Sequence, residues 1–234
     1  MKAILMAAGM GTRISQKTNQ PKSLLKAGNT SIIRHTVEML QQNNIDVVVI
    51  LGFKGDLIIK ELEGLNVRFY TNPFFRVTNS IASLWFAREE LKSNQDIIFA
   101  NADVYWEEDI LELLKNSSKD VIMLGDKSRI ENGDYFFKCK NDKIIDYGKE
   151  LDVHNRTCEY VGMAKISKEF MPEFIQNLDC LIKDEDYNLW WENILYSLSD
   201  KKDIHVKDVE GKFWGEVDTI EDYERIVNYI NKKN

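Results

Sequence analysis

Residues 3–13 read AILMAAGMGTR, an apolar run followed by a glycine-rich turn that ends in an arginine. The apolar part, residues 3–8, has the length and composition of a buried strand. Gly9 and Gly11 permit backbone conformations closed to other residues, and they lack side chains that would keep a phosphate away from the backbone amides. We therefore predict a strand that leads into a phosphate-binding loop.

Basic side chains surround this loop. The first 37 residues contain six of them and no Asp or Glu, although the whole chain has a formal net charge of -7. They are Lys2, Arg13, Lys17, Lys22, Lys26 and Arg34. Arg13 offers a rigid fork of donors for phosphate, and Lys22, directly after Pro21, offers a mobile point charge. The segment is expected to bind an anion.

Two better-known phosphate loops do not fit this segment. A P-loop requires Gly-Lys followed by Ser or Thr, and the turn after residue 8 has no such triplet. A dinucleotide-binding loop has a third glycine three positions after the second, where this chain has Ile14. The structural alternative is a plain tight turn with solvent-exposed bases.

Strand and helix patterns alternate along the first half of the chain. Strands are predicted at 3–8, 46–51, 67–70, 96–100 and 120–124, with helices at 31–43 and 80–91. Strands without polar alternation favour a parallel sheet that is covered on both faces. The predicted fold is α/β, a three-layer sandwich with a mostly parallel, Rossmann-like central sheet.

The second half of the chain has a mixed pattern. Short strands are predicted at 135–138, 143–147 and 159–166, with helices at 169–177, 186–198 and 220–231. No linker-like stretch or internal repeat interrupts the chain, so residues 1–234 are expected to form a single domain.

Composition excludes several classes of function. Beyond residue 37 there are 38 acidic side chains against 25 basic ones, which argues against nucleic-acid binding. No stretch has the length of a membrane span or of a signal peptide's apolar region, so a cytoplasmic protein is expected. Cys139, Cys158 and Cys180 lack metal-site spacing. The oligomeric state is left open, and a homo-oligomer is compatible with the sequence.

Three carboxylates have positions that suit a metal. Asp103 follows the predicted strand at 96–100, and ligands of open α/β sheets bind beyond the carboxyl ends of strands. Glu216 and Asp218 have i, i+2 spacing, which places both on one face of an extended segment. Hard oxygen ligands suit Mg²⁺. The structural alternatives are a solvated loop acid for Asp103 and an N-cap of the last helix for Asp218.

Several motifs together support a family resemblance. They are the loop through Arg13, Pro21-Lys22, Asn79 with Ser83-Leu84-Trp85, Asn101-Ala102-Asp103, Tyr187 with Trp190-Trp191-Glu192-Asn193, and Gly215-Glu216-Val217-Asp218. With them the chain resembles the nucleotidyltransferases that build CDP-alcohols and NDP-sugars. It resembles most narrowly the short bacterial cytidylyltransferases typified by phosphocholine and 2-aminoethylphosphonate cytidylyltransferase. It departs from the family in lacking Pro-Leu-Thr after the arginine and in having Gln20 before the Pro-Lys pair.

The resemblance implies a fold of the nucleotide-diphospho-sugar transferase type and an activity. That activity is transfer of CMP from CTP to a small amine-bearing phosphate or phosphonate, with release of pyrophosphate. Arg13 and Lys22 are the implied catalytic residues, and Asp103, Glu216 and Asp218 the implied Mg²⁺ ligands. The implied nucleotide-binding residues are Ala7, Ala8, Gly9, Gly11, Thr12, Arg13, Asn79, Ser83 and Ala102.

An aromatic and acidic segment at 184–192 is the candidate acceptor site. Aromatic faces beside carboxylates attract organic cations, so Asp186, Tyr187, Trp190 and Trp191 are expected to bind the acceptor's amine. Both tryptophans also have helical core spacing to the apolar residues at 194 and 195. We therefore expect one tryptophan in the core and the other near the acceptor.

Three other functions remain as alternatives. A sugar-1-phosphate nucleotidyltransferase that uses UTP or dTTP would normally carry a C-terminal extension. A non-catalytic nucleotide-binding regulator would be expected to have lost Lys22 or the metal carboxylates. A glycosyltransferase would show Asp-x-Asp after the middle strand, where Asn101-Ala102-Asp103 offers one carboxylate.

Overall fold

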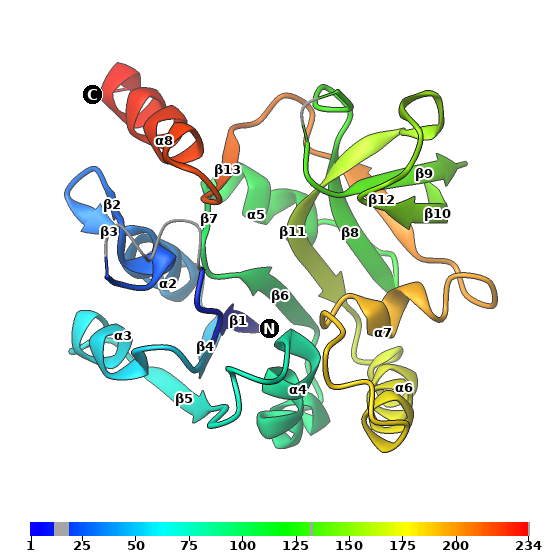
Figure 1. Cartoon of the computed structure of the whole chain (residues 1–234), viewed down its shortest axis with the longest axis horizontal. Coiled ribbons are helices and arrows are strands. Elements are labelled where there is room, and N and C mark those ends of the chain that lie inside the picture. Colours follow the sequence, from blue (N-terminus) through cyan, green and yellow to red (C-terminus); the bar gives the residue numbers. More distant parts are fainter. Residues whose placement is uncertain (12–18, 132, 234) are drawn as a thin grey trace.

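The computed structural model of the chain describes residues 1–11, 19–131 and 133–233 (Figure 1). Among these residues, nine strands form one sheet in the order β5-β4-β1-β6-β11-β8-β12-β10-β9. Their bounds are β1 Lys2–Ala7, β4 Asp46–Leu51, β5 Val67–Thr71, β6 Ile97–Asn101, β8 Val121–Asp126, β9 Phe136–Lys140, β10 Lys143–Gly148, β11 Cys158–Ile166 and β12 His205–Asp208. The four strands β5, β4, β1 and β6 are mutually parallel, and β11 runs antiparallel to β6.

Both faces of the sheet are buried, because alternate residues of the apolar strands enter different cores. In β1, Ala3 and Leu5 belong to one buried cluster, and Ile4 and Met6 belong to the other. Helices α2 (Ile32–Gln42), α3 (Gly55–Glu61) and α5 (Glu108–Lys115) pack into the first cluster. Helices α4 (Ser80–Phe86), α6 (Met171–Lys183) and α7 (Asn193–Tyr196) pack into the second. The predicted three-layer α/β sandwich is confirmed.

Small elements complete the architecture at the edges of these layers. The 3-10 helices are η1 Lys22–Leu24, η2 Arg88–Lys92 and η3 Val153–Asn155, and the short strands are β2 Lys26–Ala27, β3 Thr30–Ser31, β7 Val104–Trp106 and β13 Trp214–Glu216. The last helix, α8 (Ile220–Lys233), contacts β13 and β2 through a third apolar cluster that includes Leu25, Val217 and Ile226. Within the described part of the chain, no helix is long and apolar enough to cross a membrane.

The predicted boundaries hold best where the apolar pattern is continuous, as in β4, which spans the predicted residues 46–51. The short helices α3 and α5 were not predicted. The helix predicted at 186–198 is wrong in extent, since only Asn193–Tyr196 is helical. The preceding turn bonds to the start of α4 instead: Tyr187 and Leu189 carbonyls accept from Asn79 and Ile81. Tertiary hydrogen bonds therefore override the helical spacing.

Candidate active site

The glycine loop follows β1 at the edge of the sheet where the parallel strands end. The carbonyl of Ala8 accepts a hydrogen bond from the N–H of Phe53, just after β4 (3.1 Å). Gly11 has a φ of 54°, and a Cβ on it would lie 2.8 Å from two carbons of the Lys22 side chain. A glycine is therefore favoured here both by the backbone conformation and by the close approach of Lys22. Thr12 and Arg13 lie outside the described residues.

Lys22, the first residue of η1, is nearly enclosed by acidic side chains. Its ammonium contacts the carboxylate of Asp218 and lies 3.6 Å from that of Asp103, and its side chain is 10% exposed. Burial alone would lower the pKa of Lys22, but Asp103, Asp218 and Glu216 outweigh burial and raise that pKa above its usual value. Lys22 is therefore a fixed positive charge at neutral pH.

A two-stranded antiparallel ribbon brings together the carboxylates from distant parts of the sequence. β7 pairs with β13 so that Val104 lies opposite Glu216, and the N–H of Val217 donates to the carbonyl of Asp103 (3.1 Å). Asp103 directly precedes β7, Glu216 ends β13, and Asp218 follows two residues later. The ribbon thus places Asp103, Glu216 and Asp218 around Lys22.

The helix cap that competed for Asp218 is formed by other residues. The Asp222 carboxylate accepts hydrogen bonds from the N–H groups of Thr219 (2.9 Å) and Asp218 (3.3 Å). The Thr219 hydroxyl oxygen accepts from the N–H of Asp222 in return (3.2 Å). This reciprocal pattern is a capping box at the start of α8. The carboxylate of Asp218 contacts Lys22 instead.

Three carboxylates, those of Asp103, Glu216 and Asp218, surround the single ammonium of Lys22. Burial raises the pKa of Asp103, an effect that Lys22 opposes and the charge of Asp218 increases. Burial, followed by the charges of Asp103 and Asp218, raises the pKa of Glu216 well above its usual value. Half-buried hard oxygen donors with excess negative charge fit a cation such as Mg²⁺. However, over residues 1–11, 19–131 and 133–233, no three His, Cys, Asp or Glu side chains are arranged as a ready-made metal site.

A cavity of about 330 Å³ lies beside these acids, within the usual size range of a small-molecule site. Its wall combines the end of β1, the start of α4, the three acids and a set of aromatic side chains. Of the expected nucleotide-binding residues, Ala8, Gly9, Asn79 and Ser83 line it. Ala7 and Ala102 are buried in the core beneath the loop.

Asn79 and Ser83 are held in place by bonds within the protein. The Asn79 side chain caps α4 by accepting from the N–H of Ser80 (2.8 Å) and donates to the Asn188 carbonyl (3.3 Å). The Ser83 hydroxyl accepts from the side-chain amide of Asn72 (2.9 Å). These residues shape the cavity wall, and their contact with a nucleotide stays a prediction.

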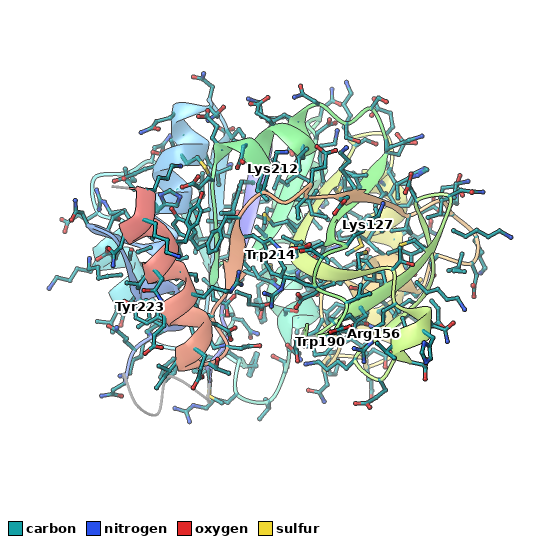
Figure 2. All side chains as sticks on the ribbon, turned by 90° about the horizontal axis from the view of Figure 1, so that it is seen from above. Lys127, Arg156, Trp190, Lys212, Trp214 and Tyr223 are labelled. Atoms are coloured by element: carbon teal, nitrogen blue, oxygen red, sulfur yellow. The ribbon has the colours of Figure 1, made fainter. Side chains whose placement is uncertain are left out.

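The two tryptophans separate as expected. Trp191 is fully buried, stacks on Phe99 with ring centroids 5.1 Å apart, and donates its indole N–H to Asn101 (3.2 Å). Trp190, labelled in Figure 2, is 39% exposed and lines the cavity, with its ring edge-on to that of Tyr135. The assignment of Trp191 to the acceptor is therefore wrong, because the side chain belongs to the core.

Asp186 and Tyr187 are not among the residues that line this cavity within the described parts of the chain. Both are exposed, and the left-handed backbone at Glu185 (φ 66°) turns the segment away from helical geometry. The carbonyl of Tyr187 instead accepts from the N–H of Asn79 (2.8 Å). Their predicted role was based on the aromatic and acidic composition of the segment, which does not show which of its side chains face the cavity.

Sequence reasoning missed a group of cavity residues from the second half of the chain. They are Asp134, Tyr135, Lys149, Tyr160, Glu192 and Tyr196. Burial raises the pKa of Glu192 to about 7, although its contacts with Asn101 and Tyr160 oppose this shift. Glu192 belongs to the Trp190-Trp191-Glu192-Asn193 motif, which was the one signal available. Asp134, Tyr135 and Lys149 flank β9 and β10, Tyr160 lies in β11, and Tyr196 ends α7. The sequence pattern does not reveal that these elements meet at one cavity.

The comparison with protein families agrees with this geometry. Residues 3–143, more than half of the chain and including the glycine loop, Lys22 and Asp103, match the MobA-like NTP transferase domain. The chain belongs to this family. The resemblance inferred from the motifs is thereby confirmed at the level of the NTP transferases.

Two relatives match this chain over nearly its whole length. The chain is 26% identical to the CTP:phosphoglutamine cytidylyltransferase of Campylobacter jejuni, over 96% of this chain and 98% of the relative. It is 25% identical to the choline-phosphate cytidylyltransferase of Streptococcus pneumoniae, over all of both chains. The solved structure of a CTP:phosphocholine cytidylyltransferase from Streptococcus pneumoniae superimposes with a TM-score of 0.80 at 22% identity, covering 98% of each chain. That likeness supports the fold.

Proposed function

We propose that this NTP transferase is a cytidylyltransferase, which transfers CMP from CTP to a small amine-bearing phosphate or phosphonate and releases pyrophosphate. The observation that carries the proposal is the position of Lys22 among Asp103, Glu216 and Asp218, beside a cavity at the end of β1. The full-length similarity to two cytidylyltransferases supports CTP as the nucleotide.

The proposed reaction needs positioning and charge more than a protein nucleophile. An oxygen of the acceptor's phosphate attacks the α-phosphorus of CTP, and the bond to the β-phosphate oxygen breaks as pyrophosphate leaves. Two anions must approach each other, so a fixed ammonium at the α-phosphate stabilises the transition state. Lys22 is the described residue suited to this task, because its raised pKa keeps it charged. The loop amides near Gly9 and Gly11, with Arg13, would hold the departing pyrophosphate.

Asp103, Glu216 and Asp218 would hold Mg²⁺, which when bound supplies charge neutralisation for the phosphates. Their own contribution is a concentration of negative charge that keeps Lys22 beside the cavity before substrates arrive. The Lys22 ammonium, which Asp103 and Asp218 hold in the free protein, would be the group that contacts the phosphate.

The test is pyrophosphate release by the purified chain with Mg²⁺, measured for the four common NTPs against two sets of acceptors. One set contains amine-bearing phosphates and phosphonates, and the other contains hexose 1-phosphates. The proposal predicts release with CTP and an aminated acceptor. Preference for UTP or dTTP with a hexose phosphate would assign the chain to sugar activation. No release with any pair, together with measurable CTP binding, would favour a nucleotide-binding regulator.

A further inference from the structure

An exposed part of the cavity wall carries an ion pair on an aromatic ring. The Lys149 ammonium lies 2.6 Å from the Asp134 carboxylate and 5.3 Å from the centroid of the Trp190 ring. Asp134 precedes β9, Lys149 follows β10, and Trp190 precedes α7, so three separate segments contribute to this cluster. All three side chains line the cavity. We call them the Asp134–Lys149–Trp190 cluster.

The cluster bears on which acceptor fits the cavity. An aromatic face beside a carboxylate is suited to an organic cation, but here an ammonium of the chain itself occupies that place. Among the described residues lining the cavity, Lys149 is the one Lys or Arg side chain. A substrate with only an ammonium at this end would meet the like charge of Lys149. A substrate that also carries a negative group would meet a counterion.

The ion pair is also suited to exchange with a ligand. The Lys149 and Asp134 side chains are 37% and 49% exposed, and exposed ion pairs add little to stability. A ligand that offers each partner a new counterion can therefore separate the pair at little cost in free energy. The ligand's carboxylate would pair with Lys149, and its ammonium would pair with Asp134 beside the Trp190 ring.

We propose that the acceptor is zwitterionic, a phosphorylated compound of the amino-acid type that carries both an ammonium and a carboxylate, and that Lys149 reads the carboxylate. This inference rests on the proposed cytidylyltransferase function and narrows its acceptor class. It assigns Lys149 as a specificity-determining residue and Asp134 as the partner of the amine. In the free protein, Asp134 occupies the place of the acceptor's carboxylate and Lys149 the place of its ammonium.

Matched acceptors test the proposal directly. O-Phosphoserine and phosphoethanolamine differ by one carboxylate, as do O-phosphohomoserine and 3-aminopropyl phosphate, so the two pairs separate charge from length. With CTP and the wild-type protein, we expect kcat/KM to be at least tenfold higher for the carboxylate-bearing acceptor than for its matched amine in at least one of the two pairs. In Lys149→Met this preference falls at least tenfold, mainly through KM, whereas Lys149→Arg retains most of it.

Lys143→Met is the matched control, because Lys143 on β10 is 40% exposed, close to the 37% of Lys149, and pairs with Asp203 (2.7 Å) outside the cavity. It should leave the preference unchanged. A wild-type enzyme that prefers the amines without a carboxylate, or a preference that Lys149→Met does not alter, would overturn the proposal.

A second readout separates this inference from the proposed function. Binding of the same four compounds to the intact protein is measured by calorimetry with a non-hydrolysable CTP analogue present. Tighter binding of the carboxylate-bearing members, lost in Lys149→Met, supports the zwitterionic acceptor even if no pyrophosphate is released. Release with phosphoethanolamine but not with O-phosphoserine, and no binding of O-phosphoserine or O-phosphohomoserine, supports the function and refutes the zwitterion.

Discussion

Glu192 is predicted to make the protein less stable at alkaline pH than at acid pH. The side chain is 6% exposed, and burial raises its pKa from 4.5 to about 7. Between these two pH values the folded chain keeps a proton that the unfolded chain has released, so stability falls as the pH rises. Above pH 7 the accumulated loss is about 3 kcal/mol, at about 1.4 kcal/mol for each tenfold change in proton affinity.

The Glu192→Gln variant removes this titration while keeping the shape of the side chain. We expect its free energy of unfolding, relative to wild type, to increase by about 2 kcal/mol between pH 5.5 and pH 8. Urea unfolding at both pH values, with EDTA present, measures this difference. Glu169→Gln is the control, because the Glu169 side chain is 64% exposed. Parallel pH profiles for wild type and Glu192→Gln would refute the assignment of a raised pKa to Glu192.

Three further predictions concern the loop and the acids. Lys22→Met should lower kcat about 10²- to 10³-fold and change CTP affinity less than tenfold. Lys26→Met, which removes a 59% exposed ammonium, should change neither. Steady-state kinetics measures kcat and calorimetry measures CTP affinity, and equal losses in both would contradict the role of Lys22. Gly11→Ala should destabilise the fold by about 1–2 kcal/mol in urea unfolding, because a side chain is strained at φ 54° and meets Lys22. Gly9→Ala, with no atom within 4 Å of the added Cβ, should destabilise it by less than half as much. Chelation with EDTA should abolish pyrophosphate release and Mg²⁺ should restore it; release that persists in EDTA would exclude a metal requirement.

Much of the fold follows from local apolar pattern. The strand at 46–51 was predicted because five consecutive apolar residues leave no solvent-facing side, and the structure buries Val47 to Leu51 on both faces. Helix α2 was predicted to within one residue at each end from its pattern, and in the structure the Ser31 side chain caps it by accepting from the N–H of Arg34. In both segments the local sequence alone indicates the secondary structure, without knowledge of contacts to distant parts of the chain.

Lys22 and the three acids were assigned to one site from the strand-end rule and the family motifs together, but their direct contacts were not predicted. The rule alone places Asp103 near the glycine loop. Glu216 and Asp218 arrive through the pairing of β7 with β13, a contact between distant segments that no local pattern encodes. Trp214, labelled in Figure 2, is the first residue of that strand and donates its indole N–H to Asp126 (2.8 Å), which ties β13 to the main sheet.

The acceptor side was predicted poorly for the same reason. The segment 186–192 has helical spacing, yet its backbone carbonyls accept hydrogen bonds from the start of α4. Asp186 and Tyr187 therefore lie outside the cavity lining. Lys149 and Asp134 meet Trp190 through three separate chain segments. Neither residue stands in an informative motif, and only the folded arrangement identifies them.

The central claim is attack at the α-phosphorus of CTP, and phosphorus-31 NMR of the complete reaction tests it most directly. The account predicts that CTP is replaced by one equivalent of pyrophosphate and one equivalent of a product with two coupled, inequivalent phosphorus signals, one from CMP and one from the acceptor. Formation of CDP with orthophosphate or with a phosphorylated acceptor would place the attack at the γ-phosphorus and contradict the account.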